Sequence, residues 1–339
     1  MKDWSKLSFN YIKTNTIVCA SFKDGKWGPI ESRTCDDVTI SSLSASLHYG
    51  IECFEGLKAF YGKDGKIRIF RPDENAKRLI RSANYLGIES PSEEMFVEMV
   101  KQVVIENKDF IPPYETRASL YIRPTLIGVG PQLGLYPSKD VFFMVVVLPV
   151  GSYAGGIDSP VSTVISREFD RAAPKGSGSY KVGGNYAAAM YASCQAKSVG
   201  YADVLYLDPK ENKFIDEFSS SNFFGIKNGT YITPESKSVL PSITNKSLEQ
   251  VARDLGYKTE RRPVPLEELE TFEEVGECGT AVVITPISRI DDKPAITGEE
   301  CTKSYHYAAC GPVSRQLYKH LTGIQYGEVE DKHGWCVVL

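Results

Sequence analysis

The chain has 339 residues, enough for one large domain or two of ordinary size. Hydrophobic residues make up 42% of it and charged residues 24%, close to the averages of globular proteins, which excludes an intrinsically disordered chain. A net charge of -4 creates no basic field that would attract nucleic acid or anionic lipid, so we expect neither as a partner.

The N-terminus and the cysteines indicate a cytoplasmic protein. "MKDWSKLSF" lacks the basic-then-apolar order of a signal peptide, and the longest apolar run, "VFFMVVVLPV" at 141–150, is too short to span a bilayer. The eight cysteines form no CxxC motif, and the four histidines have no metal-ligand spacing. We therefore expect reduced thiols, no metal site and no membrane partner.

The sequence pattern of the first half of the chain predicts strands, then two helices, then two more strands. Strand patterns occur at 15–22 and 26–30. The segment 66–88 predicts a strand and then a helix, with Pro72 near its start and Gly87 at its end. A second helix is expected within 92–111, and buried strands at 117–128 and 140–150.

A small, Gly-rich segment at 150–160, "VGSYAGGIDSP", is the best candidate for a linker. Beyond it we expect helices within 185–200, 240–257 and 305–323. The expected strands are 161–166, 202–208, 213–218 and 278–290, together with a hairpin at 222–234 that turns over "KNG". Strands and helices mix without regular alternation, which predicts an α+β protein with domains at 1–149 and 161–339.

Two Gly-rich stretches resemble nucleotide-binding loops only superficially. "GVGPQLG" at 128–134 has the wrong glycine spacing and contains a proline, and "PKGSGSYK" at 174–181 lacks the P-loop spacing. We expect no nucleotide at either stretch.

Lys181 stands out because small residues follow it, in "SYKVGGNYAAAMYA" at 179–192. A solvated surface lysine needs no such clearance, whereas a lysine bonded to a flat cofactor does. Pyridoxal 5'-phosphate (PLP) enzymes use a lysine as a Schiff base, and they also require a partner for the ring nitrogen and a cradle for the phosphate. Taken alone, Lys181 also fits an ordinary surface residue.

Other segments could meet those requirements. Glu217 lies in "FIDEFSSSNFF", where acids and serines interrupt a pair of strands. "VLPSIT" precedes a helix, whose first backbone N–H groups suit a phosphate. "GECGTAVVITP" at 276–286 places a threonine hydroxyl among small residues beside a strand. Each segment could equally be a simple turn or helix cap, but they occur together and in this order.

Taken together, these motifs resemble those of the branched-chain amino acid aminotransferases, PLP enzymes of fold type IV, and more closely the larger subgroup of that family. The resemblance covers roughly residues 9–320 through the motifs "SLHYGIECFEGLKAF", "FRPDENAKRL", "LYIRP", "LPVGSY", "YKVGGNYA", "DEFSSSNFF", "LPSIT" and "GTAVVITP". It implies a two-domain fold like that of D-amino acid aminotransferase, with a smaller N-terminal α/β domain and a larger C-terminal PLP-binding domain.

The resemblance also implies roles for the cofactor-binding residues. Lys181 would hold PLP as a Schiff base and move the proton between Cα and C4′, and Glu217 would pair with the ring nitrogen. Tyr186 would bind the 3′-oxygen, and Leu240 would pack on the ring. The phosphate would be held by Arg78, Ser242, Ile243, Thr244 and Thr280. Ser242 stands where many relatives have glycine, which puts the geometry of that loop in question.

For the substrate, the resemblance implies an apolar pocket with one cationic rim. Tyr121 and Arg123 match residues that receive the distal carboxylate of glutamate or 2-oxoglutarate, while Thr280 and Ala281 match the place that receives the α-carboxylate. The apolar pocket would be lined by Phe9, Tyr49, Phe54 and Tyr153. The aromatic residues could instead be core packing, and Arg123 a structural ion-pair residue.

The implied activity is reversible amino transfer between L-leucine, L-isoleucine or L-valine and 2-oxoglutarate, giving branched 2-oxo acids and L-glutamate, in a homodimer. The alternatives are a D-amino acid aminotransferase, an aminodeoxychorismate lyase, or a catalytically silent PLP-binding relative. After "GTA" the chain reads "VVITP" without the CxxC of the mammalian enzymes, so we expect no thiol-disulfide regulation of that type.

Overall fold

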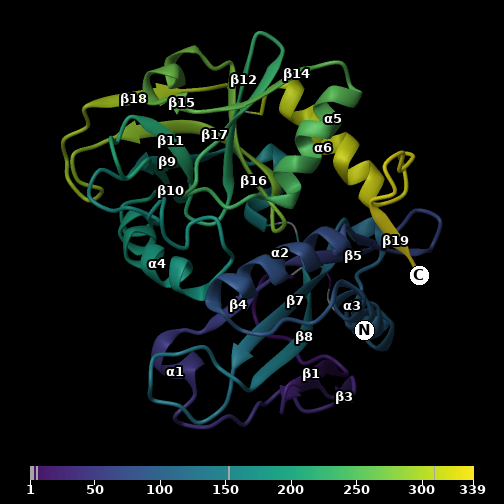
Figure 1. Ribbon diagram of the computed structural model, residues 1–339. Coiled ribbons are helices and arrows are strands. Elements are labelled where there is room, and N and C mark those ends of the chain that lie inside the picture. Colours follow the sequence, from purple (N-terminus) through teal and green to yellow (C-terminus); the bar gives the residue numbers. More distant parts are fainter. Residues whose placement is uncertain (1–3, 5–6, 152, 309) are drawn as a thin grey trace. The chain divides into compact units, whose positions relative to one another are not determined.

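A computed structural model describes residue 4 and residues 7–151, 153–308 and 310–339, without the side chains of 153–155. Its internal contacts divide the chain into two units of similar size (Figure 1). The first unit contains Met1–Ser152, Tyr180–Gly183 and Gly323–Leu339, and the second contains Tyr153–Ser179 and Gly184–Thr322.

This division differs from the expected continuous C-terminal domain at 161–339 and from its expected larger size. Two segments fold with the first unit because they pair with its strands. Val182 forms a bridge with Cys53, and Cys336–Val338 pairs with Arg68–Phe70. The chain therefore leaves and re-enters the first unit around Lys181.

The first unit is built on one sheet, in the order β19-β6-β5-β7-β8-β1-β2, with β3 paired to β1 and β4 to β7. Its pairings are antiparallel, as in the full-length ladder between β7 and β8. Its strands are β1 (Ile17–Lys23), β2 (Lys26–Trp27), β3 (Glu31–Arg33), β4 (Glu52–Phe54), β5 (Leu57–Tyr61), β6 (Ile67–Phe70), β7 (Ser119–Gly128), β8 (Val141–Val150) and β19 (Cys336–Val338).

Helices α2 (Pro72–Leu86) and α3 (Glu93–Glu106) pack on this sheet and confirm the expected elements. Pro72 opens α2, and Gly87 ends it with φ 69°, a left-handed conformation that favours glycine. Ser92 caps α3 by accepting a hydrogen bond from the Met95 N–H. The short helix α1 (Ala45–Tyr49) precedes β4.

The sheet of the second unit closes into a ring of pairings. Its order is β14-β13-β12-β16-β17-β9-β10-β11-β15, with β18 beside β17, and a pairing between Glu217 and Asn222 joins β11 back to β12. The strands are β9 (Val161–Ile165), β10 (Asp203–Leu207), β11 (Phe214–Phe218), β12 (Asn222–Lys227), β13 (Thr230–Pro234), β14 (Lys258–Arg262), β15 (Val264–Pro265), β16 (Glu274–Gly279), β17 (Val283–Asp292) and β18 (Lys303–His306).

The longer helices of this unit are α4 (Gly183–Ser198), α5 (Ile243–Asp254) and α6 (Pro312–Gln325). Figure 1 shows α5 beside α6 and α4 apart from them. Short 3-10 helices occur at Lys108–Phe110, Tyr114–Thr116, Tyr153–Asp158 and Leu266–Thr271.

The mixed sheets and helices confirm the α+β class, but two expected elements were wrong in detail. The expected strand 278–290 is the end of β16, a turn at 280–282 and then β17, because Gly279 pairs back with Val283. The expected helix 305–323 begins only at Pro312, because Lys303–His306 is a strand paired with β17.

Candidate active site

The backbone of Lys181 is held from two sides within the first unit. Its N–H donates to the Ser82 hydroxyl of α2 at 3.0 Å, and its carbonyl accepts from the Phe54 N–H at 3.1 Å. The side chain extends over the Phe54 ring, with Nζ 4.8 Å from the ring centroid. A helix and a strand thus fix where this amine lies.

The residues on either side of Lys181 reinforce this position. The Tyr180 ring stacks on Tyr85 at 4.0 Å. At Gly183, a Cβ would lie 1.9 Å from the Glu52 carboxyl group, whereas at Gly184 no other atom lies within 4 Å of that position. The small residue at 183 therefore makes room for Glu52, a reason that the sequence did not reveal.

Arg78, the expected phosphate ligand, is buried and forms a bidentate ion pair that the sequence analysis missed. Its Nε and Nη2 atoms each lie 2.7 Å from an oxygen of Glu55, which is completely buried. The Asn75 amide donates to the same carboxylate at 2.7 Å. A planar guanidinium held along one edge keeps a fixed orientation for its other N–H groups.

Aromatic rings and one arginine gather near Phe54 in the same unit. The Arg123 guanidinium lies 4.6 Å from the Phe54 ring centroid, and its Nη2 donates to the Tyr121 hydroxyl at 3.0 Å. The Phe9 ring meets Tyr121 edge to face. Gly56 permits this arrangement, because a Cβ there would lie 2.2 Å from the Tyr121 oxygen.

Arg123 retains unused hydrogen-bonding capacity in this cluster. Its Nε is buried and has no hydrogen-bond partner among the described residues. A buried N–H without a hydrogen-bond partner is costly. The structure thus brings together Lys181, Phe54, Tyr121, Arg123 and Phe9, as expected from the sequence, although their roles stay predictions.

The other two expected pocket tyrosines are not part of this cluster as described. The Tyr49 hydroxyl, on α1, donates to the Leu133 carbonyl, and its side chain is 42% exposed. The side chain of Tyr153 lies outside the described part of the chain.

Glu217 is a buried acid at the ring closure of the second unit. Its Oε1 accepts from Arg171 Nη1 at 2.6 Å and from the Leu240 N–H at 3.0 Å, and its Oε2 accepts from the Asn222 amide at 2.6 Å. Burial raises the pKa of Glu217 to about 7, although Arg171 opposes the shift. The sequence analysis missed Arg171; its place in the loop before Lys181 gave no signal of this pairing.

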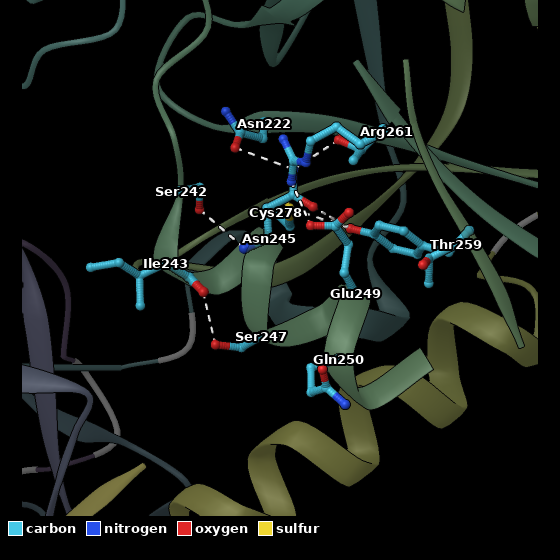
Figure 2. A network of polar contacts seen from close by, with 12 residues as sticks. Asn222, Ser242, Ile243, Asn245, Ser247, Glu249, Gln250, Thr259, Arg261 and Cys278 are labelled. Atoms are coloured by element: carbon cyan, nitrogen blue, oxygen red, sulfur yellow. Dashed lines mark hydrogen bonds and ion pairs between the residues drawn. The ribbon is translucent and has the colours of Figure 1, made fainter. Parts of the chain in front are cut away.

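Helix α5 presents its N-terminus next to Leu240 in the chain. Ser242 is the N-cap, and its hydroxyl accepts from the Asn245 N–H at 3.1 Å (Figure 2). The backbone of Ser242 is extended, with φ -74°, so glycine is not required there. The Ile243 and Thr244 N–H groups lie in the first turn, where N–H groups lack helical acceptors and attract anions.

The remaining expected ligands lie at element ends of the second unit. Tyr186 is in the first turn of α4, and Thr280 and Ala281 are in the turn between β16 and β17. That turn ends at Val283, whose φ of 62° is rare for a β-branched residue. Backbone strain of this kind often marks a ligand-binding turn.

In the described part of the chain, no helix is long and apolar enough to cross a membrane. The same residues contain no group of three His, Cys, Asp or Glu side chains arranged to hold a metal ion.

The chain is similar in sequence and fold to known aminotransferases. The chain is 44% identical over 336 residues to the branched-chain-amino-acid aminotransferase of Helicobacter pylori. The aligned residues cover 98% of this chain and 96% of that protein. It is 28% identical to solved structures of two branched-chain amino acid aminotransferases, covering 96% of this chain and 99% of each. The Escherichia coli enzyme gives a TM-score of 0.78, and the T.th. enzyme with pyridoxamine 5'-phosphate also gives 0.78.

The family model for amino-transferase class IV matches residues 52–290, most of the chain and both units. This range includes Lys181, Glu217 and the start of α5. The chain therefore belongs to the class IV aminotransferase family.

Proposed function

We propose that the protein is a PLP-dependent branched-chain-amino-acid aminotransferase, which transfers the amino group between L-leucine, L-isoleucine or L-valine and 2-oxoglutarate. The relatives and solved structures that resemble it over nearly their whole length carry that name. The observation that carries the proposal is Lys181, an amine held on rigid backbone over an aromatic ring, in a chain that also buries Glu217.

The donor groups of the chain fit PLP. A primary amine, a buried acid, a buried arginine and a capped helix N-terminus are the groups needed for an aldehyde, a ring nitrogen and a phosphate. When bound, PLP supplies an aldehyde that condenses with amines and a ring that accepts the electrons released when a Cα proton leaves. Lys181, Glu217, Arg78 and the first turn of α5 would hold it.

Each residue then has a defined task. Lys181 Nζ moves the proton at the substrate Cα. The Glu217 carboxylate would hold the proton on the ring nitrogen, and Arg171 favours that ionised form. Tyr186 would donate to the 3′-oxygen, and Leu240 would pack against the ring. Phosphate binding belongs to Arg78, Thr280 and the N–H groups of Ser242, Ile243 and Thr244.

The cluster around Phe54 suits substrates of two kinds. The rings of Phe54, Tyr121 and Phe9 offer an apolar surface for a branched side chain. Arg123 and the Tyr121 hydroxyl, joined by a hydrogen bond of 3.0 Å, are the groups that we assign to the distal carboxylate of 2-oxoglutarate or glutamate. Thr280 and Ala281, in the turn between β16 and β17, are the residues that we assign to the α-carboxylate.

We further propose a homodimer located in the cytoplasm. The cysteines of the described residues are free thiols, the state that the cytoplasm maintains. An exposed apolar patch supports dimer formation; it consists of Leu43, Leu47, Tyr49, Leu133, Leu135 and Tyr136.

A panel of amino donors with 2-oxoglutarate tests the function. We expect wild-type protein to convert L-leucine, L-isoleucine and L-valine but not D-alanine. Lys181→Ala should lose at least about three orders of magnitude in turnover, since a proton-transfer and covalent group is removed. Absorbance of bound PLP, measured in parallel, identifies a silent PLP-binding protein if wild type is yellow but inactive. Conversion of D-alanine alone would indicate a D-amino acid aminotransferase instead.

A further inference from the structure

A buried chain of amide groups leads from Glu217 to helix α5. Asn222, the first residue of β12, lies opposite Glu217 where the sheet ring closes. Its Nδ2 donates to Glu217 Oε2 at 2.6 Å and to the Leu240 carbonyl at 3.2 Å. Both protons of that amide are therefore used on the Glu217 side, and its Oδ1 must face elsewhere.

Asn245 receives that oxygen. Asn245 Nδ2 donates to Asn222 Oδ1 at 3.3 Å and to Thr233 Oγ1 at 2.8 Å, and its Oδ1 accepts from the Tyr231 hydroxyl at 2.8 Å. Figure 2 shows Asn245 at the start of α5 with dashed contacts to Ser242 and Asn222. The side-chain amide thus uses every donor and its acceptor.

Thr233 and Tyr231, which contact the Asn245 side chain, determine which way its amide group is turned. The Thr233 hydroxyl donates to the Phe223 carbonyl at 2.8 Å, so its oxygen is left to accept. The Tyr231 hydroxyl donates to Asn245 Oδ1 at 2.8 Å, while its other polar contact, Cys278 Sγ, is at 4.0 Å. Hydrogen-bond donation therefore runs in one direction, from Tyr231 through Asn245 and Asn222 to Glu217.

Asn245 also belongs to the first turn of α5. Its backbone N–H donates to the Ser242 hydroxyl at 3.1 Å, which fixes the helix start next to Ile243 and Thr244. One residue thereby connects the acid that we assign to the ring nitrogen with the turn that we assign to the phosphate.

We propose that Asn245 is a positioning residue, which orients the Asn222 amide so that it donates to Glu217 and favours the ionised carboxylate. This inference rests on the proposed function. Asn245 acts through Asn222 and touches neither substrate nor cofactor in this assignment. The other groups facing Glu217 are Arg171, the Leu240 N–H and the neighbouring Asp216, so the contribution of Asn245 is partial.

Asn245→Asp is the sharpest test because it changes the donating NH₂ group into an oxygen without changing size. When it is ionised, the aspartate cannot donate to Asn222 and instead accepts from the Asn222 amide, so that Asn222 turns over and places its Oδ1 against Glu217 Oε2. The ionised form of Glu217 loses a donor and meets a repulsive oxygen. Its hold on the ring-nitrogen proton weakens accordingly.

The measurement is the 15N NMR shift of the ring nitrogen in holoprotein loaded with 15N-labelled PLP, followed from about pH 6 to about pH 9. For Asn245→Asp we expect the midpoint of ring-nitrogen deprotonation to fall by about one pH unit relative to wild type, the effect of one hydrogen bond to a charged group. Turnover with L-leucine should fall roughly tenfold at nearly unchanged KM.

Thr233→Val is the matched control. It removes hydrogen bonds from the same buried cluster but leaves Asn245 donating to Asn222. We expect it to lower the melting temperature without moving the ring-nitrogen midpoint. If Asn245→Asp does not fold, Asn245→Ser is measured in the same way, since serine is too short to reach Asn222.

The outcomes separate the inference from the proposed function. A ring nitrogen protonated in wild type and equally protonated in both Asn245 variants overturns the inference alone. Equal midpoint shifts in Thr233→Val and the Asn245 variants also overturn it, because they would reflect general loosening. Wild-type protein that binds no PLP overturns the proposed function itself.

Discussion

Buried charges in the candidate site come with partners that only the three-dimensional structure reveals. The roles of Lys181 and Glu217 are predictions from several motifs that occur together and in order, since each residue alone also fits an ordinary lysine or a turn acid. Arg171 and Glu55 could not be predicted, because only their ion pairs indicate a part in the site. Arg171 pairs with Glu217 and Glu55 pairs with Arg78, and each partner is distant in the sequence. Asn245 was hidden likewise, as one polar residue in an amphipathic helix.

Arg123 should discriminate between the two halves of the reaction. We expect Arg123→Met to raise KM for 2-oxoglutarate roughly ten- to a hundredfold, because a carboxylate loses a charge-assisted donor. KM for L-leucine should change less than about threefold, since its side chain meets the rings. Steady-state kinetics with both substrates checks this, with Arg117→Met, an exposed arginine of the same unit, as control. Equal losses for both substrates would contradict the assignment.

Glu217 should make the apoprotein less stable as pH rises. Its pKa is raised from 4.5 to about 7, so it is protonated in both folded and unfolded states below pH 4.5. Above that pH the unfolded state ionises first, and stability falls until pH passes the folded-state value of about 7. The shift corresponds to on the order of 3 kcal/mol.

Glu217→Gln removes this dependence. We expect the difference in free energy of unfolding, variant minus wild type, to rise by on the order of 3 kcal/mol between about pH 4.5 and about pH 8 in urea melts of apoprotein. Other titrating groups cancel in the difference. Glu299→Gln, at an exposed site of the same unit, is the matched control. A flat difference for Glu217→Gln would show that its burial does not affect ionisation.

At the scale of elements, the helices whose ends are marked by local sequence signals could be predicted. Helices α2 and α3 were predictable because Pro72, Gly87 and the Ser92 cap mark their ends. The turn at 280–282 was not predictable, because no Gly-Asn turn signal marks the chain reversal there. Strand β19 was not predictable either, because it depends on pairing with β6, which is distant in the sequence. The pairing of Glu217 with Asn222, which closes the sheet of the second unit into a ring, was not predictable for the same reason: no local sequence signal marks it.

The Glu55–Arg78 pair should matter for both stability and binding, because it joins the β4–β5 turn to α2. Glu55→Gln leaves a buried guanidinium without its counter-charge, so we expect a loss of about 3 kcal/mol in the free energy of unfolding. PLP affinity should also fall, as Arg78 loses its orientation. Asp64→Asn breaks an ion pair in which the aspartate is exposed, the pair with Arg68, and should destabilise the protein much less. Similar losses in both variants would contradict the assignment.

At the scale of the molecule, the chain crosses between the units on both sides of Lys181. The lysine and the Phe54 cluster belong to the first unit, while Glu217 and α5 belong to the second. The class IV aminotransferase match at residues 52–290 covers parts of both units.

The apolar patch of the first unit is a single surface rather than scattered residues. The Gln132 N–H donates to the Leu43 carbonyl at 2.8 Å, and Ser44 forms a bridge with Pro131, so α1 and the 131–136 loop lie side by side. Leu135 is 79% exposed there. Apolar groups exposed together on one surface are stabilised when a second protein covers them.

We therefore expect Leu135→Asp to weaken the homodimer, because a charge would be buried in the interface without a partner. Sedimentation velocity at micromolar concentration should show a dimer for wild type and at least about a tenfold larger dissociation constant for the variant. Ile105→Asp places the same charge on an exposed apolar site of α3 and should leave the dimer intact. A monomeric wild type would contradict the dimer itself. A dimer unaffected by Leu135→Asp would instead place the interface on another surface, since a buried aspartate could not be tolerated without loss of affinity.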